Sequence, residues 1–289
     1  MSERKACETT TMASPLDAHL SKHHGLGNDF LVWLTESLPL DAPDRARRWC
    51  DRRTGIGADG LIFGLPVADG ETTTDLVFRL FNSDGSPAAV SGNGLRCLAQ
   101  AEARRRGVSE LSLRVSTPAG VRLCTVQPSD DAHTVVASVA MGAATTGPTP
   151  TSSALMTDAG PSVAAVQRWE TVDIGNPHVV CQVDDPTAID LAVAGPAVEQ
   201  FFPDGANVHF VSVTGNQELL LRVWERGAGI TEACGTGATA AAAVFHRWGL
   251  VGESVRVQMP GGDVTVGVGD ELTLTGQACH IADITVANA

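Results

Sequence analysis

The sequence lacks any apolar run approaching the roughly 18 residues that a membrane helix needs, so a membrane-spanning protein is not expected. The first twenty residues also lack the apolar segment of a secretory signal and carry Thr, Ser and mixed charges. We therefore expect residues 1–20 to be a disordered tail and the protein to be cytoplasmic.

Paired cysteine motifs are missing as well. The seven cysteines are odd in number, show no CxxC spacing, and stand singly in apolar runs: Cys7, Cys50, Cys97, Cys124, Cys181, Cys234 and Cys279. This pattern excludes a disulfide scaffold and a zinc site, and no metal ligands are predicted. For any one cysteine, a small buried apolar residue is the first interpretation. Cys234 differs because of its place in the chain.

Basic residues are scarce, with 20 Lys and Arg against 33 Asp and Glu, which gives a net charge of −13. Nucleic acid is a disfavoured partner because its phosphates require a basic surface. The glycines between residues 52 and 60 are too few and wrongly spaced for a dinucleotide fingerprint. A small anionic substrate held by local donors remains compatible with the composition.

Two short motifs organise what is present. They are Ser91-Gly92-Asn93-Gly94 and, 143 positions later, Cys234-Gly235-Thr236-Gly237, each between an expected strand and an Ala-rich expected helix. The surrounding residues repeat in order: an arginine twelve places and a polar residue nine places before each motif, a Gly-Asn pair further upstream, and a proline 26 or 27 residues downstream (Arg79 and Arg222, Asn82 and Glu225, Gly27-Asn28 and Gly175-Asn176, Pro118 and Pro260). The repetition indicates two homologous halves related by a pseudo-twofold axis.

Each half is a run of short strands around one or two helices, which predicts an α+β fold. We expect two pseudo-symmetric domains, each a strongly curved, mostly antiparallel sheet wrapped around a central helix, with the active site in the cleft between them. The expected boundaries are 21–116 plus 276–289 for the N-terminal half and 117–275 for the C-terminal half. Residues 143–163, rich in Ala, Thr, Ser, Pro and Gly, are interpreted as an insertion in the second half.

The chemistry expected at the two motifs follows from helix termini. A small residue followed by Gly-x-Gly at the start of a helix leaves backbone N–H groups free to bind an anion. Cys234 at such a position feels the positive end of the helix dipole, which favours a lowered thiol pKa. One base from each half, on opposite faces of one carbon, is the arrangement for cofactor-free epimerisation or racemisation. The plainer alternative is that both motifs are only glycine-rich helix starts.

The sequence resembles the diaminopimelate epimerase family, within the wider superfamily of proline racemases and phenazine proteins. The matching motifs occur in order between about residues 22 and 285: His24-Gly25-Leu26-Gly27-Asn28-Asp29-Phe30, Gly55-Ile56-Gly57-Ala58-Asp59-Gly60, Phe81-Asn82-Ser83-Asp84-Gly85, Gly92-Asn93-Gly94, Gly175-Asn176-Pro177-His178, Asn207-Val208, and Glu225-Arg226-Gly227-Ala228-Gly229 through Cys234-Gly235-Thr236-Gly237. The resemblance implies epimerisation of LL-2,6-diaminopimelate to the meso form at the α-carbon, in lysine and peptidoglycan precursor synthesis, without pyridoxal phosphate or another cofactor.

The resemblance also assigns roles to individual residues. Catalytic roles fall to Cys234 and Ser91, with Glu225 and His178 assisting them. Substrate-binding roles fall to the side chains of Asn28, Asn82, Asn176, Asn207, Glu225 and Arg226 and to the backbone of Gly92, Asn93, Gly235 and Thr236. Arg226 pairs with the distal carboxylate in a bidentate manner.

One position departs from the family, in which both motifs begin with cysteine, whereas the first begins here with Ser91. An aliphatic hydroxyl is a much weaker acid than a thiol and needs a neighbouring base. Cys97 does not replace the missing thiol, because six residues along a helix place it about 240° around and roughly 9 Å along the axis. The family's acidic residue after Asp-Gly-Ser is also absent, with Pro87 in its place.

Three hypotheses follow. The chain is a diaminopimelate epimerase in which Ser91 serves one face with a partner or a relayed water; or it is a related isomerase or lyase with Cys234 as single base and Ser91 assisting a leaving group; or it is a non-catalytic amino-acid-binding homologue. The expected partner is a small-molecule amino acid. A homodimer is an open expectation, and neither nucleic acid nor a membrane is expected.

Overall fold

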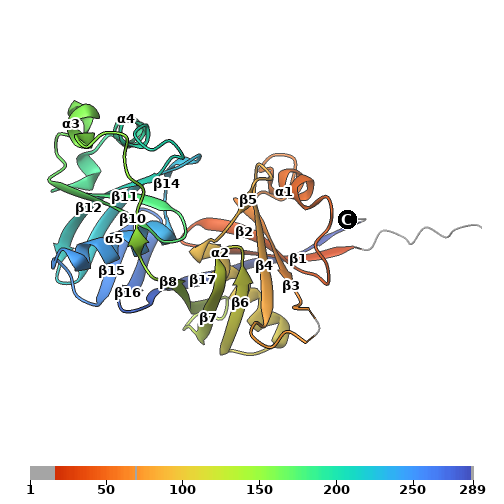
Figure 1. The fold of residues 1–289 in the computed structure, drawn as a ribbon. Coiled ribbons are helices and arrows are strands. Elements are labelled where there is room, and N and C mark those ends of the chain that lie inside the picture. The colour runs from red at the N-terminus through yellow and green to blue at the C-terminus, as the bar shows by residue number, and fades with distance from the viewer. Residues whose placement is uncertain (1–16, 69, 288–289) are drawn as a thin grey trace, which may run out of the picture.

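A computed structural model describes residues 17–68 and 70–287. The N-terminal lobe in Figure 1 contains β1 (Ala18–Gly25), β2 (Asn28–Leu34), α1 (Ala42–Cys50), β3 (Gly60–Leu65), β4 (Leu76–Asn82), β5 (Pro87–Ala88), α2 (Gly92–Arg106), β6 (Leu111–Thr117), β7 (Gly120–Pro128) and β8 (Thr134–Gly142). Short elements follow: β9 (Thr145–Thr146), α3 (Leu155–Asp158) and η1 (Pro161–Val163).

The other lobe holds β10 (Arg168–Asp173), β11 (Pro177–Gln182), η2 (Pro186–Ala188), α4 (Leu191–Glu199), β12 (Asn207–Gly215), β13 (Glu218–Glu225), β14 (Gly229–Thr231), α5 (Gly235–Arg247), β15 (Ser254–Met259) and β16 (Gly262–Gly267). The long last strand, β17 (Leu272–Val286), runs from this lobe back into the first one. The sheet is mixed and the helices are few, as expected for an α+β fold.

The strands of the first lobe close into a ring. The pairs run β1–β2, β2–β3, β3–β4, β4–β6, β6–β7, β7–β8, β8–β17 and β17–β1, and of these only β2–β3 and β4–β6 are parallel. Helix α2 contacts every strand of this ring. Residues Gly92–Ala103 of α2 are all buried, so this part of the helix has no solvent-exposed face.

The second lobe pairs its strands in the order β10–β11, β11–β12, β12–β13, β13–β15, β15–β16 and β16–β17, with β11–β12 and β13–β15 parallel. Helix α5 contacts seven strands, β10–β13 and β15–β17. Its Ala-rich sequence keeps side chains small enough for this enclosure, and residues 235–245 are all buried. One apolar cluster includes residues of both α2 and α5, so a shared core joins the two lobes.

Residues 18–20, expected in the disordered tail, instead begin β1 and pair with residues 284–286. Ala18 and Leu20 are 1% and 3% exposed, because β17 and α1's apolar cluster cover them. The rest of the expected tail, residues 1–16, lies outside the described residues.

Within the described residues, no helix combines the length and apolar character needed to cross a membrane.

Candidate active site

Ser91 and Cys234 occupy equivalent places at the starts of α2 and α5. Each is the N-cap residue in an extended conformation, with φ and ψ of −144° and 119° for Ser91 and −131° and 107° for Cys234. The Ser91 Oγ accepts a hydrogen bond from the Gly94 N–H at 3.0 Å, and the Cys234 Sγ accepts one from the Gly237 N–H at 3.4 Å. In both motifs the last glycine therefore gives its N–H to the first residue's side chain.

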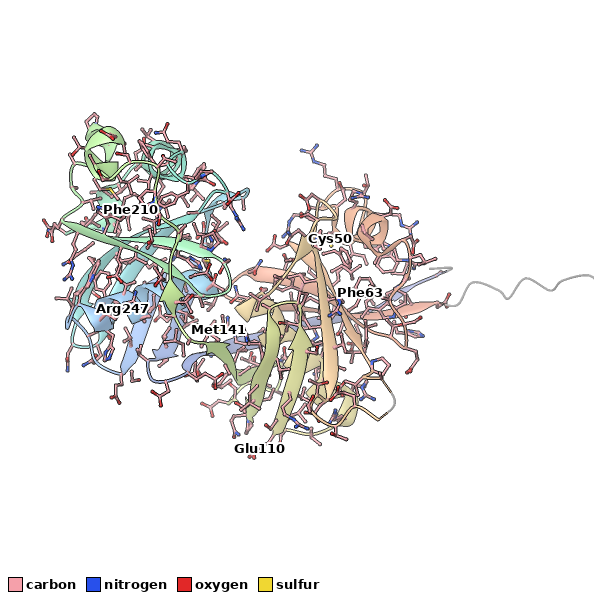
Figure 2. The ribbon with its side chains drawn as sticks, in the orientation of Figure 1. Cys50, Phe63, Glu110, Met141, Phe210 and Arg247 are labelled. Atoms are coloured by element: carbon pink, nitrogen blue, oxygen red, sulfur yellow. The ribbon has the colours of Figure 1, made fainter. Side chains whose placement is uncertain are left out.

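The first turns of α2 and α5 lie against one another. A Cβ atom on Gly235 would lie 3.7 Å from the Gly92 Cα and 2.8 Å from Leu274 Cδ2, and one on Gly92 would lie 2.6 Å from the same Leu274 atom. A side chain at either glycine would displace the end of Leu274, a residue of β17 that lies against both turns. Met141, labelled in Figure 2 where the lobes meet, also lies against Gly92. The free N–H groups of two helix starts are thus brought together, an arrangement suited to binding an anion.

Glu225 accompanies Cys234 at the second helix start, close enough for the two groups to shift one another's pKa. The Thr231 hydroxyl donates a hydrogen bond to Glu225 Oε1, and the Cys234 Sγ lies 3.5 Å from Thr236 Oγ1. Burial raises the pKa of Cys234 well above its usual value, and the Glu225 carboxylate raises it further. The helix-dipole argument predicted the opposite direction and is wrong here, because burial and a nearby carboxylate outweigh the stabilising N–H of Gly237. Cys234 therefore rests as the thiol.

Burial also raises the pKa of Glu225, although its hydrogen bonds to Thr231 and Cys234 act the other way. A carboxylate with a raised pKa is a stronger base, so its proton affinity moves toward that of the thiol it contacts. The pair is suited to hold one proton between sulfur and oxygen.

Ser91 has a simpler environment. It is half-buried, and within the described part of the chain its only side-chain hydrogen bond is the one it accepts from Gly94. The hydroxyl proton thus remains available to a substrate or a water, while the Gly94 N–H stabilises negative charge on the oxygen. No carboxylate or imidazole among residues 17–68 and 70–287 is hydrogen-bonded to Ser91 as a base.

His178 lies behind Asn176. It is fully buried, its Nε2 lies 2.8 Å from Asn176 Oδ1, and its Nδ1 lies 2.8 Å from His209 Nε2. Since the amide oxygen only accepts, we assign the proton of His178 to Nε2, and His209 must then donate from Nε2 to His178 Nδ1. His209 Nδ1 is left buried without a partner in the described structure. His209 also packs on α5, because a Cβ on Gly237 would lie 2.2 Å from its ring.

Both imidazoles are held neutral. Burial lowers the pKa of His178 well below its usual value, with His209 and Arg226 contributing, and burial alone lowers the pKa of His209 to about 3. In the described residues no hydrogen bond connects His178 to Cys234 or Glu225. The assisting role assigned to His178 stays a prediction, and its direct contacts are with His209 and with Asn176, a predicted substrate-binding residue.

This pair makes a prediction about stability. The unfolded chain binds protons at both histidines below pH 6.5, whereas the folded chain does not, so the free energy of unfolding falls as the pH drops from 6.5. The limiting slope is about 1.4 kcal/mol per pH unit for each histidine. Urea unfolding between pH 7.5 and 5 should show a shallower loss for His209→Gln than for the unchanged protein. The surface variant His19→Gln is the control, and equal slopes for His209→Gln and wild type would contradict the assignment.

Two of the predicted asparagines, Asn28 and Asn176, contact the first turns of α2 and α5, the paired helix starts. Asn28 donates to Asp59 Oδ2 at 2.7 Å and accepts from Asn93 Nδ2 at 3.2 Å. Asn176 Nδ2 lies 3.5 Å from Thr236 Oγ1, at the first turn of α5. Asn28, Asn93 and Asn176 are therefore oriented by protein contacts before any substrate binds.

Asn207 is used differently. Its Nδ2 donates to the Pro177 carbonyl at 2.9 Å, and its Oδ1 accepts from the Arg226 backbone N–H at 3.1 Å. It thus fixes the backbone on both sides of the site. The Arg226 side chain is exposed, and its Nη1 donates to the Asp204 carbonyl at 2.8 Å. Asn82 is exposed at the end of β4, where its Nδ2 donates to Ser86 Oγ at 3.0 Å.

Three residues of this region were not predicted as site residues: Asp59, Arg96 and His209. Asp59 lies in the motif Gly55–Gly60, and the glycines of this motif were a sequence signal that could have identified it. It accepts from Asn28 and from Arg52, which also contacts Asp29. His209 lies in an apolar strand, and only the register of β11 and β12, which sets His178 beside Asn207, brings it to His178.

The described residues contain no group of three or more His, Cys, Asp or Glu side chains arranged to hold a metal ion. A surface hollow of about 480 Å³ is lined by residues of β1, β2, α2 and β17 such as His19, Arg104 and Thr285. We locate the candidate site at the helix starts instead, because the converging N–H groups and titratable side chains are there.

Known proteins resemble this chain along most of its length. A family profile described as Diaminopimelate epimerase matches residues 20–147 and 170–281. The diaminopimelate epimerase of Nostoc punctiforme is 41% identical over 257 residues, covering 85% of this chain and 90% of the relative. That of Methanothermobacter thermautotrophicus is 38% identical over 278 residues, covering 89% and 92%.

Among solved structures, a phenazine biosynthesis protein of the PhzF family from Bacillus anthracis superposes with a TM-score of 0.71 at 16% identity, covering 94% of this chain and 99% of the other. A hydroxyproline epimerase from Agrobacterium vitis superposes with a TM-score of 0.68 at 19% identity, covering 94% and 92%. At such identities these two structures show a shared fold.

Proposed function

The chain belongs to the diaminopimelate epimerase family, and from that premise we propose that Cys234 and Ser91 act on opposite faces of one α-carbon. The protein is an isomerase that converts LL-2,6-diaminopimelate to meso-diaminopimelate without pyridoxal phosphate, a step of lysine and peptidoglycan precursor synthesis. The observation that carries the assignment of faces is the contact between the first turns of α2 and α5, with the two residues as their N-caps.

From the same family membership we also propose that the molecule consists of two pseudo-symmetric halves, each with a helix at its centre. Support comes from the strand pairing: β2–β3 and β4–β6 are the parallel pairs of one half, and β11–β12 and β13–β15 those of the other. The predicted division at 116/117 and 275/276 stays a proposal. Pairing of β6, β7 and β8 continues past residue 117, which favours a crossover after Gly142.

In the proposed mechanism, Cys234 removes the α-proton with the help of Glu225. Glu225 takes the thiol proton, the sulfur takes the proton from the α-carbon, and the electron pair of the broken C–H bond spreads into the α-carboxylate. That carboxylate lies on the backbone N–H groups of Gly92, Asn93, Gly235 and Thr236. They stabilise the added negative charge as it develops.

On the other face, the Ser91 hydroxyl or a water that it orients returns a proton. A carbanion is a far stronger base than an alkoxide, so protonation by the hydroxyl is favourable in this direction. The Gly94 N–H then stabilises the Ser91 oxygen until water restores its proton. In the reverse direction Ser91 must act as a base, and this step is the slow one because no side-chain base is hydrogen-bonded to it in the described residues.

The remaining predicted residues bind the substrate. Asn28 and Asn176 present amide groups to the amino and carboxylate ends, Asn82 and Asn207 complete the polar lining, and Arg226 leaves the Asp204 carbonyl to pair with the distal carboxylate. Residue Glu225 serves both the base and the substrate's ammonium group. We also propose a cytoplasmic location and leave the homodimer as a proposal to be measured by sedimentation.

One assay separates this mechanism from the alternatives. The protein is incubated with LL- or meso-diaminopimelate in D₂O, and deuterium at the α-carbon and stereochemistry are followed together. Exchange accompanied by inversion is the expected result. Exchange without inversion, or loss of water or ammonia, would support the isomerase or lyase with Cys234 as its single base, an alternative favoured by the lack of a base at Ser91. Binding without exchange would identify a non-catalytic homologue.

A further inference from the structure

Arg96 lies fully buried behind the first turn of α2. Its Nη2 donates to Asn93 Oδ1, while its Nε and Nη1 have no hydrogen-bond partner in the described structure. Two glycines clear the space for the guanidinium: a Cβ on Gly25 would lie 3.1 Å from Nη2, and one on Gly276 would lie 1.8 Å from Nη1. Gly276 has no positive φ, so its lack of a side chain serves space and not backbone conformation.

Within residues 17–68 and 70–287, no carboxylate pairs with this cation. Burial is the cause that lowers the pKa of Arg96 to about 10, and the Cys97 thiol is its one titratable neighbour of note in the described residues. At neutral pH the guanidinium remains charged. The guanidinium is buried, and it also lies at the N-terminus of a helix, where the backbone already contributes positive potential. Both features destabilise the folded protein. Such an arrangement is explained if an anion binds on the other side of the helix start.

Asn93 connects the guanidinium to the candidate site. Its Oδ1 accepts from Arg96, its Nδ2 donates to Asn28 Oδ1 at 3.2 Å, and the Oδ1 lies 3.6 Å from where a Cβ on Gly235 would be. Arg96 thus fixes which way the amide of Asn93 points. The positive charge of Arg96 therefore lies directly behind Asn93, which itself adjoins the first turns of both helices.

We propose that Arg96 is a positioning residue for the epimerisation, which fixes the Asn93 amide and supplies the uncompensated positive charge that favours the carbanion at the paired helix starts. The inference rests on the proposed function, since it assumes that the reacting carboxylate lies on these N–H groups. Negative charge on that carboxylate increases when the α-proton leaves. A fixed cation then stabilises the intermediate more than the substrate, which affects kcat more than KM.

The test compares Arg96→Met and Arg96→Lys with Arg104→Met. Arg104 lies on the same helix, its side chain is 38% exposed, and it is 3.8 Å from Asp283, so it is a matched control for the loss of one arginine. Rates of epimerisation, the pH dependence of kcat/KM, and thermal unfolding midpoints are measured for each variant. The rate of the unchanged protein in the D₂O assay tests the proposed function separately.

For Arg96→Met we expect kcat to fall about tenfold or more while KM changes much less. The rising limb of the pH profile should move to higher pH, because the paired helix starts lose the positive potential that favours the deprotonated state of the site. Arg96→Lys should return the limb toward its original position, and the unfolding midpoint of Arg96→Met should not fall below that of Arg104→Met. The proposal is overturned if kcat and the pH profile stay at wild-type values, or if activity loss follows a lower midpoint and lysine restores neither the rate nor the limb.

Discussion

Replacing Cys234 with alanine should lower the rate of epimerisation by about 10²- to 10⁴-fold, the range in which a positioned acid or base contributes. The thiol is the group that contacts Glu225 at the start of α5, and burial keeps it protonated until Glu225 takes that proton. Without the sulfur atom, no group of the protein stands between the Glu225 carboxylate and the α-carbon to take the α-proton. Deuterium incorporation at the α-carbon should therefore fall together with inversion, and both are measured in one D₂O experiment.

The control for this variant is Cys181→Ala. Cys181 is a fully buried free cysteine of β11, so its replacement also leaves a small cavity in the C-terminal half. We expect that variant to retain epimerisation while losing stability. If Cys234→Ala kept exchange within about tenfold of wild type, Glu225 or a water would be the base, and the assignment of Cys234 would be wrong. Calorimetric binding of meso-diaminopimelate should be retained in Cys234→Ala.

The paired helix starts could be predicted from the sequence because their signal is local. A small residue before Gly-x-Gly specifies an N-cap, and the structure confirms Ser91 and Cys234 as N-caps of α2 and α5. Both starts contact Leu274 of β17, a strand more than 35 residues further along the chain. No local pattern marks that leucine.

The electrostatics of Cys234 could not be predicted in the same way. A helix dipole is evident from sequence, whereas the burial of the thiol and the position of Glu225 depend on tertiary structure, including the pairing of β13 with β14. Burial and the carboxylate raise the pKa of the thiol, whereas the dipole lowers it, and the first two effects are larger. The order His209, His178, Asn176 likewise depends on the parallel register of β11 and β12 and not on spacing along the chain.

Substitutions of Ser91 should change inversion in both directions. Ser91→Cys places a thiol, whose usual pKa of about 8.5 is far nearer to neutrality than that of a hydroxyl, at the same N-cap, and we expect an increase in kcat of about tenfold or more. Ser91→Ala removes the proton donor, so inversion should fall about 10²-fold. Because Cys234 and Glu225 remain, exchange of the α-proton should fall less than inversion, and the ratio of the two rates is the measurement.

A helix cap is lost in Ser91→Ala, at a cost of about 1 kcal/mol, and Asp190→Ala controls for this effect. The Asp190 side chain caps α4 by accepting from the Ala192 N–H at 3.1 Å, away from the paired helix starts, so its loss should lower stability without changing inversion. If Ser91→Ala inverted substrate as fast as wild type, water alone would protonate that face and Ser91 would serve only as a cap. If Ser91→Cys gained nothing while remaining folded, proton return on that face would not limit the reaction. The two variants together therefore decide whether the hydroxyl takes part in the chemistry or only shapes the turn that holds the carboxylate.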